Sequence, residues 1–236
     1  MTNYFFEPIG FIHSCFKEKF GIPRQPGLVP SAIATLQIES SYCRAEAFRH
    51  LETFSHIWII FVFHKSVRHQ WRATVRPPRL GGNRRVGVFA SRSGFRPNPI
   101  GQSAVELISI NRGKGKIELN LGGVDLLDGT PVLDVKPYLP YADAIYNAKA
   151  GYAHQQPVAK WPVIFSEEAA QACTDREKSR YPGLKKAITD LLGLDPRPGY
   201  RENRASQGHG MRLWDLNIKF RFNADHIMVE AIEPLS

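Results

Sequence analysis

The sequence predicts a mainly β protein, in which an N-terminal β-barrel domain is followed by a small α+β C-terminal domain. The first observation is a series of short segments before residue 147 in which apolar and polar residues alternate with the period of a half-buried strand. The second is that this part contains only one credible helix, whereas two helices are predicted beyond residue 157. Many short strands at regular intervals favour a closed or nearly closed barrel over a layered α/β sheet.

The predicted strands of the first domain differ in their patterns. Residues 56–63 are apolar after His56 and rich in β-branched and aromatic side chains, as expected for a strand buried on both faces. The single helix is predicted at about residues 44–51. The remaining strands are predicted at residues 34–38, 86–89, 103–110 and 117–121.

A turn and a boundary follow the last of these strands. The pair Asp128-Gly129 lies between apolar runs, which is the strongest short signal for a β-hairpin. Residues 147–156 are mostly small and polar, so we place a domain boundary there. The division predicts a β-barrel domain at residues 1–146 and a small α+β domain at residues 157–236.

The second domain is predicted to contain two helices and a hairpin. Ser166 precedes two glutamates and is the natural N-cap of a helix that ends near Arg180. Pro182 opens a second helix with one leucine-rich face, and Gly193 closes it. Alternation returns at residues 211–222, for which residues 226–232 are a candidate hairpin partner.

Size and composition indicate a globular cytosolic protein. The 236 residues are 43% hydrophobic, which is enough to build a core. The N-terminus has no basic region followed by a long apolar run, and the longest apolar stretch, residues 57–63, is too short to cross a bilayer. Three widely separated cysteines argue against a disulfide framework and against zinc. We therefore expect a reducing cytoplasm, no membrane and no metal.

The net charge of +9 comes from one segment. Residues 53–105 contain no aspartate or glutamate but hold nine basic residues, which account for the whole excess. Eight of the nine are arginines, whose planar guanidinium suits phosphate. We call residues 53–105 the basic segment and predict that it binds an anionic partner. The alternative is a solvated basic loop; a membrane surface is less favoured because prolines and glycines break the segment.

Two further kinds of segment contain charged side chains in arrangements that a hydrophobic core does not require. Rigid loops rich in proline and glycine at residues 19–27, 76–83 and 92–101 present arginine side chains with little entropy to lose. In an extended segment after the turn, Asp134 and Lys136 would project from one face, either as a plain ion pair or as chemical groups. The sequence contains no phosphate-binding P-loop, dinucleotide fingerprint or serine nucleophile elbow.

Six separated motifs, in order, resemble those of the TsaA-like family. The resemblance covers the first domain nearly end to end and extends into the second through Asp-Pro-Arg-Pro-Gly-Tyr at residues 195–200 and residues 213–217. The motifs are Pro-Arg-Gln-Pro at 23–26, Phe-Ser-His-Ile-Trp at 54–58, Arg-Pro-Pro-Arg-Leu-Gly-Gly-Asn at 76–83, Gly-Val-Phe-Ala-Ser-Arg at 87–92, Arg-Pro-Asn-Pro-Ile-Gly at 96–101 and Asp-Gly-Thr-Pro-Val-Leu-Asp-Val-Lys-Pro-Tyr at 128–138.

The resemblance implies a β-barrel methyltransferase unrelated to Rossmann-type enzymes. It would use S-adenosylmethionine to methylate N6 of threonylcarbamoyladenosine beside the anticodon of tRNA. The family further implies a homodimer with the cofactor close to the subunit interface. By this similarity the cofactor contacts are Arg24, Gln25, Pro26, Gly27, His64, Lys65, Arg92, Asp125, Leu126, Leu127 and Asp128.

A hypothesis for the reaction follows. The acceptor nitrogen is ureido-like and a poor nucleophile unless its proton is lost, so a base or a stabilising cation is expected. We assign Asp134 as base or orienter, Lys136 as stabiliser of the developing charge, Tyr138 as a stacking or hydrogen-bonding contact, and Asn98 as a holder of the base or the loop. The residues expected to grip the phosphates of the anticodon stem are Arg68, Arg72, Arg76, Arg79, Arg84, Arg85 and Arg96.

Two functions of other classes remain open. The basic segment alone would suit an RNA-binding barrel that performs no chemistry, which would have no reason to bind S-adenosylmethionine. A methyltransferase acting on a small anionic metabolite would bind the cofactor, but tRNA would neither compete with its substrate nor become labelled.

Overall fold

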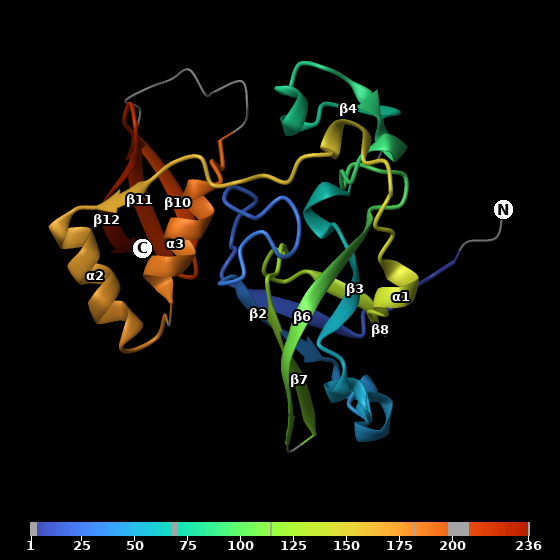
Figure 1. Ribbon diagram of the computed structural model, residues 1–236. Helices are drawn as coiled ribbons and strands as arrows, with labels where there is room; N and C mark the ends of the chain where they lie inside the picture. Colours follow the sequence, from blue (N-terminus) through green and yellow to red (C-terminus); the bar gives the residue numbers. More distant parts are fainter. Residues whose placement is uncertain (1–3, 68–69, 114, 182, 198–207, 236) are drawn as a thin grey trace.

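The computed structural model describes residues 4–67, 70–113, 115–181, 183–197 and 208–235. Six antiparallel strands form a closed barrel in the order β1-β2-β7-β6-β3-β8 (Figure 1), so the predicted barrel is confirmed. Closure pairs β1 with β8, so that each of the six strands has a neighbour on both sides. The barrel strands are β1 (Gly10–Ser14), β2 (Ile33–Ile38), β3 (His56–Val62), β6 (Ile100–Gly113), β7 (Lys116–Gly122) and β8 (Pro131–Pro137).

The strand β3 shows the two faces of the barrel. Its interior side chains Ile57, Ile59 and Phe61 are buried, whereas Trp58 and Ile60 between them point outward and are partly exposed. The prediction that this strand is buried on both faces was therefore wrong. The inner face fills the barrel, and the apolar residues on the outer face remain available for contacts.

The predicted hairpin at Asp128-Gly129 was also wrong. The strand β7 pairs with β2 and β6, whereas β8 pairs with β1 and β3, so the two strands that flank the turn are not neighbours. The turn instead docks on β1, where the Gly129 amide donates to the carbonyl of Ile12 at 2.7 Å. The Ser14 amide donates to the Asp128 carboxylate at 3.0 Å. Asp128 and Gly129 do form a turn, but the strands with which its flanking strands pair are decided by closure of the barrel.

The helix predicted at about residues 44–51 is replaced by two 3₁₀ turns, Ala45–Phe48 and Leu51–Thr53. They are separated by Arg49 and His50, and His50 has a φ of 67°. Only Phe48 is buried in these turns. A segment without an apolar stripe gains little from packing as a longer helix.

Most of the basic segment forms an excursion between β3 and β6. It contains the two-stranded pair β4 (Thr74–Val75) and β5 (Val86–Gly87) and the 3₁₀ turns His64–Ser66, Pro78–Leu80 and Val88–Ala90. The strand predicted at residues 86–89 is thus limited to its first two residues. The chain after α1 (Pro140–Asp143) passes beside this excursion before it reaches the C-terminal unit (Figure 1). A hydrogen bond from Tyr152 Oη to the Ala90 carbonyl, 3.0 Å long, joins the two.

The C-terminal unit is a four-stranded sheet in the order β10-β11-β12-β9, with α2 and α3 packed together beside it (Figure 1). Ser166 caps α2 as predicted, because its Oγ accepts from the Ala169 amide at 3.1 Å, and α2 ends at Glu177. Pro182 lies outside the described residues. The predicted strand 211–222 is two strands joined at the Trp214-Asp215 turn. The elements are β9 (Val163–Phe165), α2 (Glu167–Glu177), α3 (Leu184–Gly193), β10 (Gly208–Leu213), β11 (Leu216–Phe222) and β12 (Ile227–Pro234).

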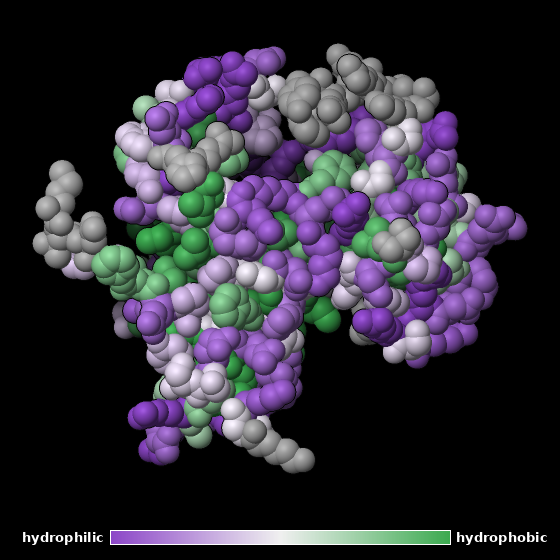
Figure 2. Space-filling view, turned by 180° about the vertical axis from the view of Figure 1, so that it is seen from behind, coloured by the Kyte–Doolittle hydropathy of each residue, from purple (hydrophilic) through white to green (hydrophobic). Residues whose placement is uncertain are grey.

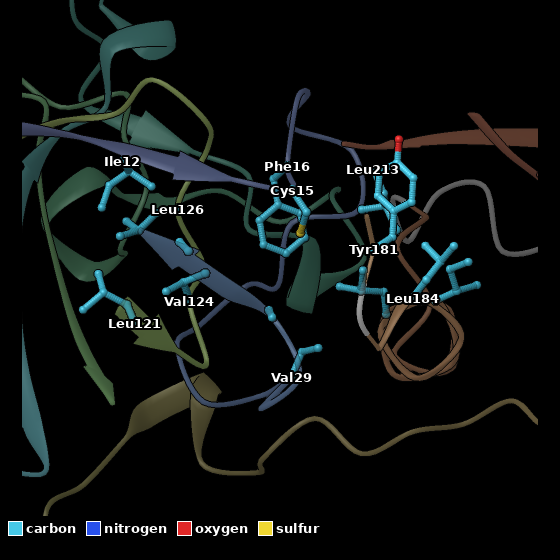
Figure 3. Close-up of a cluster of buried hydrophobic side chains, with 14 of the residues drawn as sticks. Ile12, Cys15, Phe16, Val29, Leu121, Val124, Leu126, Tyr181, Leu184 and Leu213 are labelled. Atoms are coloured by element: carbon cyan, nitrogen blue, oxygen red, sulfur yellow. The ribbon is translucent and has the colours of Figure 1, made fainter. Parts of the chain in front are cut away.

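The barrel and the C-terminal unit share one hydrophobic core (Figure 3). Phe16, just after β1, forms a β-bridge with Leu213, and the Trp214 amide donates to the Cys15 carbonyl at 2.7 Å. Phe16 and Leu213 are fully buried. This contact fixes the loop after β1 between the two units. In the described part of the chain, no helix is long and apolar enough to cross a membrane.

Candidate functional site

A cavity of about 540 Å³ opens at the end of β3, and we call it the site cavity. Its volume falls within the range of about 300–1,000 Å³ that is typical of small-molecule sites. The loop at residues 22–25, the end of β3 with the following turn, the start of β6 and residues 125–127 all contribute side chains. Strand ends and rigid loops thus meet around one hollow, although they lie far apart in the sequence.

The loop that contains Arg24 and Gln25 is held against the barrel by backbone contacts. The Gly27 amide donates to the Gly123 carbonyl at 2.8 Å. Gly123 has a φ of 64°, and a Cβ there would lie 3.2 Å from the Gly27 Cα. Glycine at position 123 therefore permits the close approach. On the cavity side, Arg92 donates to the side chain of Gln25 and so ties the loop to the basic segment.

Asp125 is the acidic side chain of the site cavity. Burial raises the pKa of this carboxyl group to about 6, although a hydrogen bond from Ser103 Oγ at 2.7 Å and the charge of Arg92 oppose the rise. Ser103 comes from β6 and is itself buried. A partly buried carboxylate in a cavity is a natural partner for a cationic ligand, because its charge is poorly solvated without one.

His64 and Lys65 belong to the same cavity lining, in the turn after β3. Burial, followed by the charge of Lys65, lowers the pKa of His64, so its imidazole is neutral near pH 7. The Lys65 carbonyl accepts from Lys19 Nζ at 2.8 Å, which draws the loop after β1 to this turn. The arrangement adds an uncharged imidazole beside two ammonium groups.

The structure brings together most of the residues expected to contact a cofactor. Pro26 and Gly27 line a neighbouring cavity instead. Asp128 lies outside both linings and forms an ion pair with Lys17 at 2.6 Å. The expected residues that line the site cavity are Arg24, Gln25, His64, Lys65, Arg92, Asp125, Leu126 and Leu127.

The residues assigned to the chemistry lie on the outer face of the barrel. Asp134 and Lys136 form an ion pair of 2.7 Å, with about half of each side chain exposed. Lys136 is directly opposite Trp58 in the pairing of β8 with β3, and the rings of Trp58 and Tyr138 are 5.5 Å apart. Trp58 also lines the site cavity, so it connects the cavity to this face. Asn98 is exposed and lines neither cavity.

The second cavity is larger, about 1390 Å³, and we call it the basic cavity. It lies between the excursion of the basic segment and residues 150–157, and no aspartate or glutamate is among its described lining residues. Arg84 is exposed outside it, and Arg68 lies outside the described residues. The residues expected to bind RNA that line the basic cavity are Arg72, Arg76, Arg79, Arg85 and Arg96.

Sequence reasoning did not assign Lys19, Trp58 or Ser103 to the site, although all three line the site cavity. Trp58 and Ser103 stand within predicted strands, where a single polar or aromatic residue carries no local signal. Lys19 begins a loop that the composition had already marked as rigid. Among the described residues, no group of three or more histidine, cysteine, aspartate or glutamate side chains is arranged to hold a metal ion.

Comparison with known proteins gives a consistent result across the whole chain. The family model for the tRNA-methyltransferase O N-terminal domain matches residues 11–144, and the model for the C-terminal domain of the same family matches residues 158–235. A protein of Escherichia coli named tRNA (adenine(37)-N6)-methyltransferase is 49% identical over 99% of this chain and 100% of its own length.

Further relatives come from Pseudomonas aeruginosa. One carries the name of an S-adenosylmethionine-dependent methyltransferase and is 47% identical over 91% of both chains. A crystal structure of TrmO from the same organism superimposes with a TM-score of 0.81 at 39% identity and covers 98% of both chains.

Proposed function

The chain belongs to the tRNA-methyltransferase O family, and from this premise we propose that it methylates N6 of threonylcarbamoyl-modified adenosine 37 in tRNA. It is an S-adenosylmethionine-dependent tRNA methyltransferase. The observation that carries the proposal is the adjacency of the two cavities. Their shared lining residues are Arg24, Gln25, Ser66, Ser91, Arg92 and Arg96, so a small-molecule site lies directly beside an arginine-lined one.

The site cavity fits the cofactor in charge and in size. S-adenosylmethionine carries a sulfonium and an ammonium, and when bound it supplies the methyl group as an electrophile. Asp125 would provide the negative charge that these cations need, while Phe61 and Leu126 form apolar walls. The neutral imidazole of His64 avoids a further positive charge. Arg24 and Gln25, which line the same cavity, would contact its remaining polar groups.

The outer-face residues would prepare the acceptor. An N6 nitrogen within a ureido group must lose its proton to become nucleophilic, and we propose that the Asp134 carboxylate receives it. Lys136 Nζ, 2.7 Å from that carboxylate, would stabilise the negative charge left on the ureido group. Tyr138, packed against Trp58, would hold the base beside the site cavity. Asn98 would support the loop that leads into β6.

We also propose that the enzyme works as a homodimer in the cytoplasm, where its tRNA substrate is found. Among the apolar and aromatic side chains that expose more than two thirds of their surface, five come from residues 5–6 and 141–146, and hydrophobic residues gather on the barrel beside the N-terminal segment (Figure 2). Monomeric proteins rarely expose large apolar patches. A second subunit packed on this face would also shield the exposed Asp134–Lys136 pair. The residues are Phe5, Phe6, Tyr141, Ile145 and Tyr146. Light scattering during gel filtration would give the mass.

The reaction is tested by incubating the protein with radiolabelled S-adenosylmethionine and two tRNA pools. One pool comes from normal cells and the other from cells that cannot make threonylcarbamoyladenosine. We expect label to enter only the normal pool. Label in both pools would move the methylated position elsewhere, and labelling of a small anionic metabolite instead of tRNA would identify another acceptor. Bound but unlabelled tRNA in both pools would indicate an RNA-binding barrel without chemistry.

The raised pKa of Asp125 predicts a pH-dependent affinity for the cofactor. Below about pH 6 the carboxyl group is protonated and neutral, and above it the carboxylate attracts the cationic cofactor. The dissociation constant should therefore fall about tenfold between pH 5 and pH 7. Isothermal calorimetry would measure it across this range.

Two variants separate Asp125 from its titrating neighbour. Asp125→Asn should weaken binding at pH 7 and flatten the pH dependence. His64→Gln should preserve the pH dependence that is due to Asp125, because the substitution leaves that carboxyl group in place and the pKa of His64 is already lowered by burial. An unchanged profile in Asp125→Asn would contradict the assigned role.

A further inference from the structure

Two aromatic side chains in the basic cavity are largely exposed to water. Phe89 is 72% exposed and Trp71 is 51% exposed, and both line the basic cavity. Their ring centroids are 6.3 Å apart. Exposure of this kind is costly in water, so a ligand that covers the rings would gain the full benefit of their burial.

The backbone around Phe89 is fixed. Val88 is 1% exposed and anchors the 3₁₀ turn that carries Phe89. Ala90, which follows Phe89, accepts the hydrogen bond from Tyr152 Oη on its backbone carbonyl. Arg79 donates to the Gln155 carbonyl across the same cavity. Residues 150–157 thus tie down the excursion on two sides. A ring on a fixed turn loses little entropy when a ligand stacks on it.

The charge of the cavity identifies the class of ligand. The guanidinium of Arg96 lies 5.8 Å from the centre of the Phe89 ring, and Arg72, Arg76 and Arg85 line the same walls. With no acidic residue among the described lining residues, the cavity suits phosphates. Phosphate-binding arginines beside exposed aromatic rings are typical of sites for single-stranded nucleic acid, where bases stack on the rings.

We propose that Phe89, supported by Trp71, stacks with the base of an anticodon-loop nucleotide adjacent to the methylated adenosine. The two cavities share lining residues, so a nucleotide bound in the basic cavity would place its neighbour at the mouth of the site cavity. The arginines bind the phosphates on either side of the stacked base. This inference rests on the proposed methylation of tRNA beside the anticodon.

Binding of an anticodon stem-loop RNA to the full-length protein tests the proposal. Fluorescence anisotropy is measured at several salt concentrations for the wild type, Phe89→Ala, Phe89→Tyr and Arg76→Ala. Phe89→Ala should weaken binding about tenfold without changing the salt slope, and Phe89→Tyr should restore the affinity. Arg76→Ala should instead reduce the slope by about 0.7, because one phosphate contact is lost.

A matched set of RNAs identifies the stacked base. Stem-loops that lack the base on one or the other side of the target adenosine are bound to the wild type and to Phe89→Ala. For one of them the loss caused by Phe89→Ala should disappear, because the interaction is already absent. Equal losses with all RNAs would overturn the proposal, as would unchanged affinity in Phe89→Ala.

Two controls distinguish base stacking from a protein interface and from a general loss of apolar surface. Ile108→Ala removes a half-exposed apolar side chain on β6, outside both linings, and should leave RNA affinity unchanged. A lower mass of Phe89→Ala in light scattering would assign the ring to a protein interface and overturn its role in RNA binding. Failure of the wild type to label tRNA would refute the proposed function itself, whereas normal labelling with an unaffected Phe89→Ala would refute only the stacking.

Discussion

Replacing Lys136 with alanine is expected to lower kcat about 100-fold or more and to leave tRNA affinity nearly unchanged. The ammonium of Lys136 lies 2.7 Å from Asp134, on the face that Trp58 connects to the site cavity. If it stabilises charge that develops only when the acceptor loses its proton, its removal raises the barrier rather than the dissociation constant. Loss of one such group typically costs a factor of about 10²–10³. Single-turnover kinetics with saturating tRNA would measure the effect.

The same variant should fold normally, which makes the kinetic effect interpretable. Both side chains of the pair are about half exposed, and such ion pairs contribute at most about 1 kcal/mol to stability. The pair Lys219–Glu233 is a matched control, with the same 2.7 Å separation and 48% exposure of each side chain on the C-terminal sheet. Lys219→Ala should change neither kcat nor tRNA affinity. Normal turnover with weaker tRNA binding in Lys136→Ala would instead place Lys136 on the RNA surface.

The barrel could be predicted from sequence because alternation is a local property. A strand with one buried face repeats every second residue, which predicted the strands at residues 34–38 and 117–121, and an apolar run predicted the strand at residues 56–63. These strands and the one predicted at residues 103–110 all lie in the barrel. The errors arise where long-range contacts decide strand pairing and side-chain burial. The Asp128-Gly129 turn joins strands that pair with others once β1 closes against β8, and the outward side chains of β3 depend on what covers the barrel. The segment at residues 44–51 has too small an apolar face to keep a helix.

In the site, too, local sequence patterns were predictable, whereas contacts between distant segments were not. The arginines and the rigid loops were visible as composition and spacing, and the resemblance supplied the residues that are expected to contact the cofactor. No local pattern indicated that Ser103, inside a regular strand, would donate to Asp125, or that residues 150–157 would form one wall of the basic cavity. Ser103 and Asp125 are 22 positions apart, and their meeting depends on the assembled barrel.

Replacing Arg197 with alanine is expected to destabilise the protein by about 3–5 kcal/mol. Arg197 and Asp195 form an ion pair of 2.8 Å in which the side chains are only 3% and 10% exposed, and the guanidinium stacks 3.4 Å from the centre of the Phe222 ring. Removing the arginine leaves the aspartate buried without its partner, which is the costly way to break such a pair. The cation–π contact with Phe222 is lost as well. Thermal unfolding followed by circular dichroism should show a lower Tm, by roughly 10 °C.

The contrast with an exposed pair isolates the effect of burial. Arg180→Ala breaks an ion pair of 3.2 Å with Asp215, in which 74% and 51% of the side chains are exposed, and it should cost less than about 1 kcal/mol. The double variant Asp195→Ala/Arg197→Met should recover part of the loss, because no unpaired charge then remains buried. A Tm for Arg197→Ala equal to that of Arg180→Ala would contradict the argument.

Arg197 also links the C-terminal unit to the site cavity, so its replacement should affect cofactor affinity as well as stability. Its backbone carbonyl accepts a hydrogen bond of 3.2 Å from Arg24 Nη2, and Arg24 lines both cavities. If the buried pair fixes this carbonyl, Arg197→Ala should weaken cofactor binding at temperatures well below its Tm, whereas Arg180→Ala should not. Cofactor affinity that stays at the wild-type value while the Tm falls would confine Arg197 to the core. A joint fall would show that the C-terminal unit positions the loop that contains Arg24.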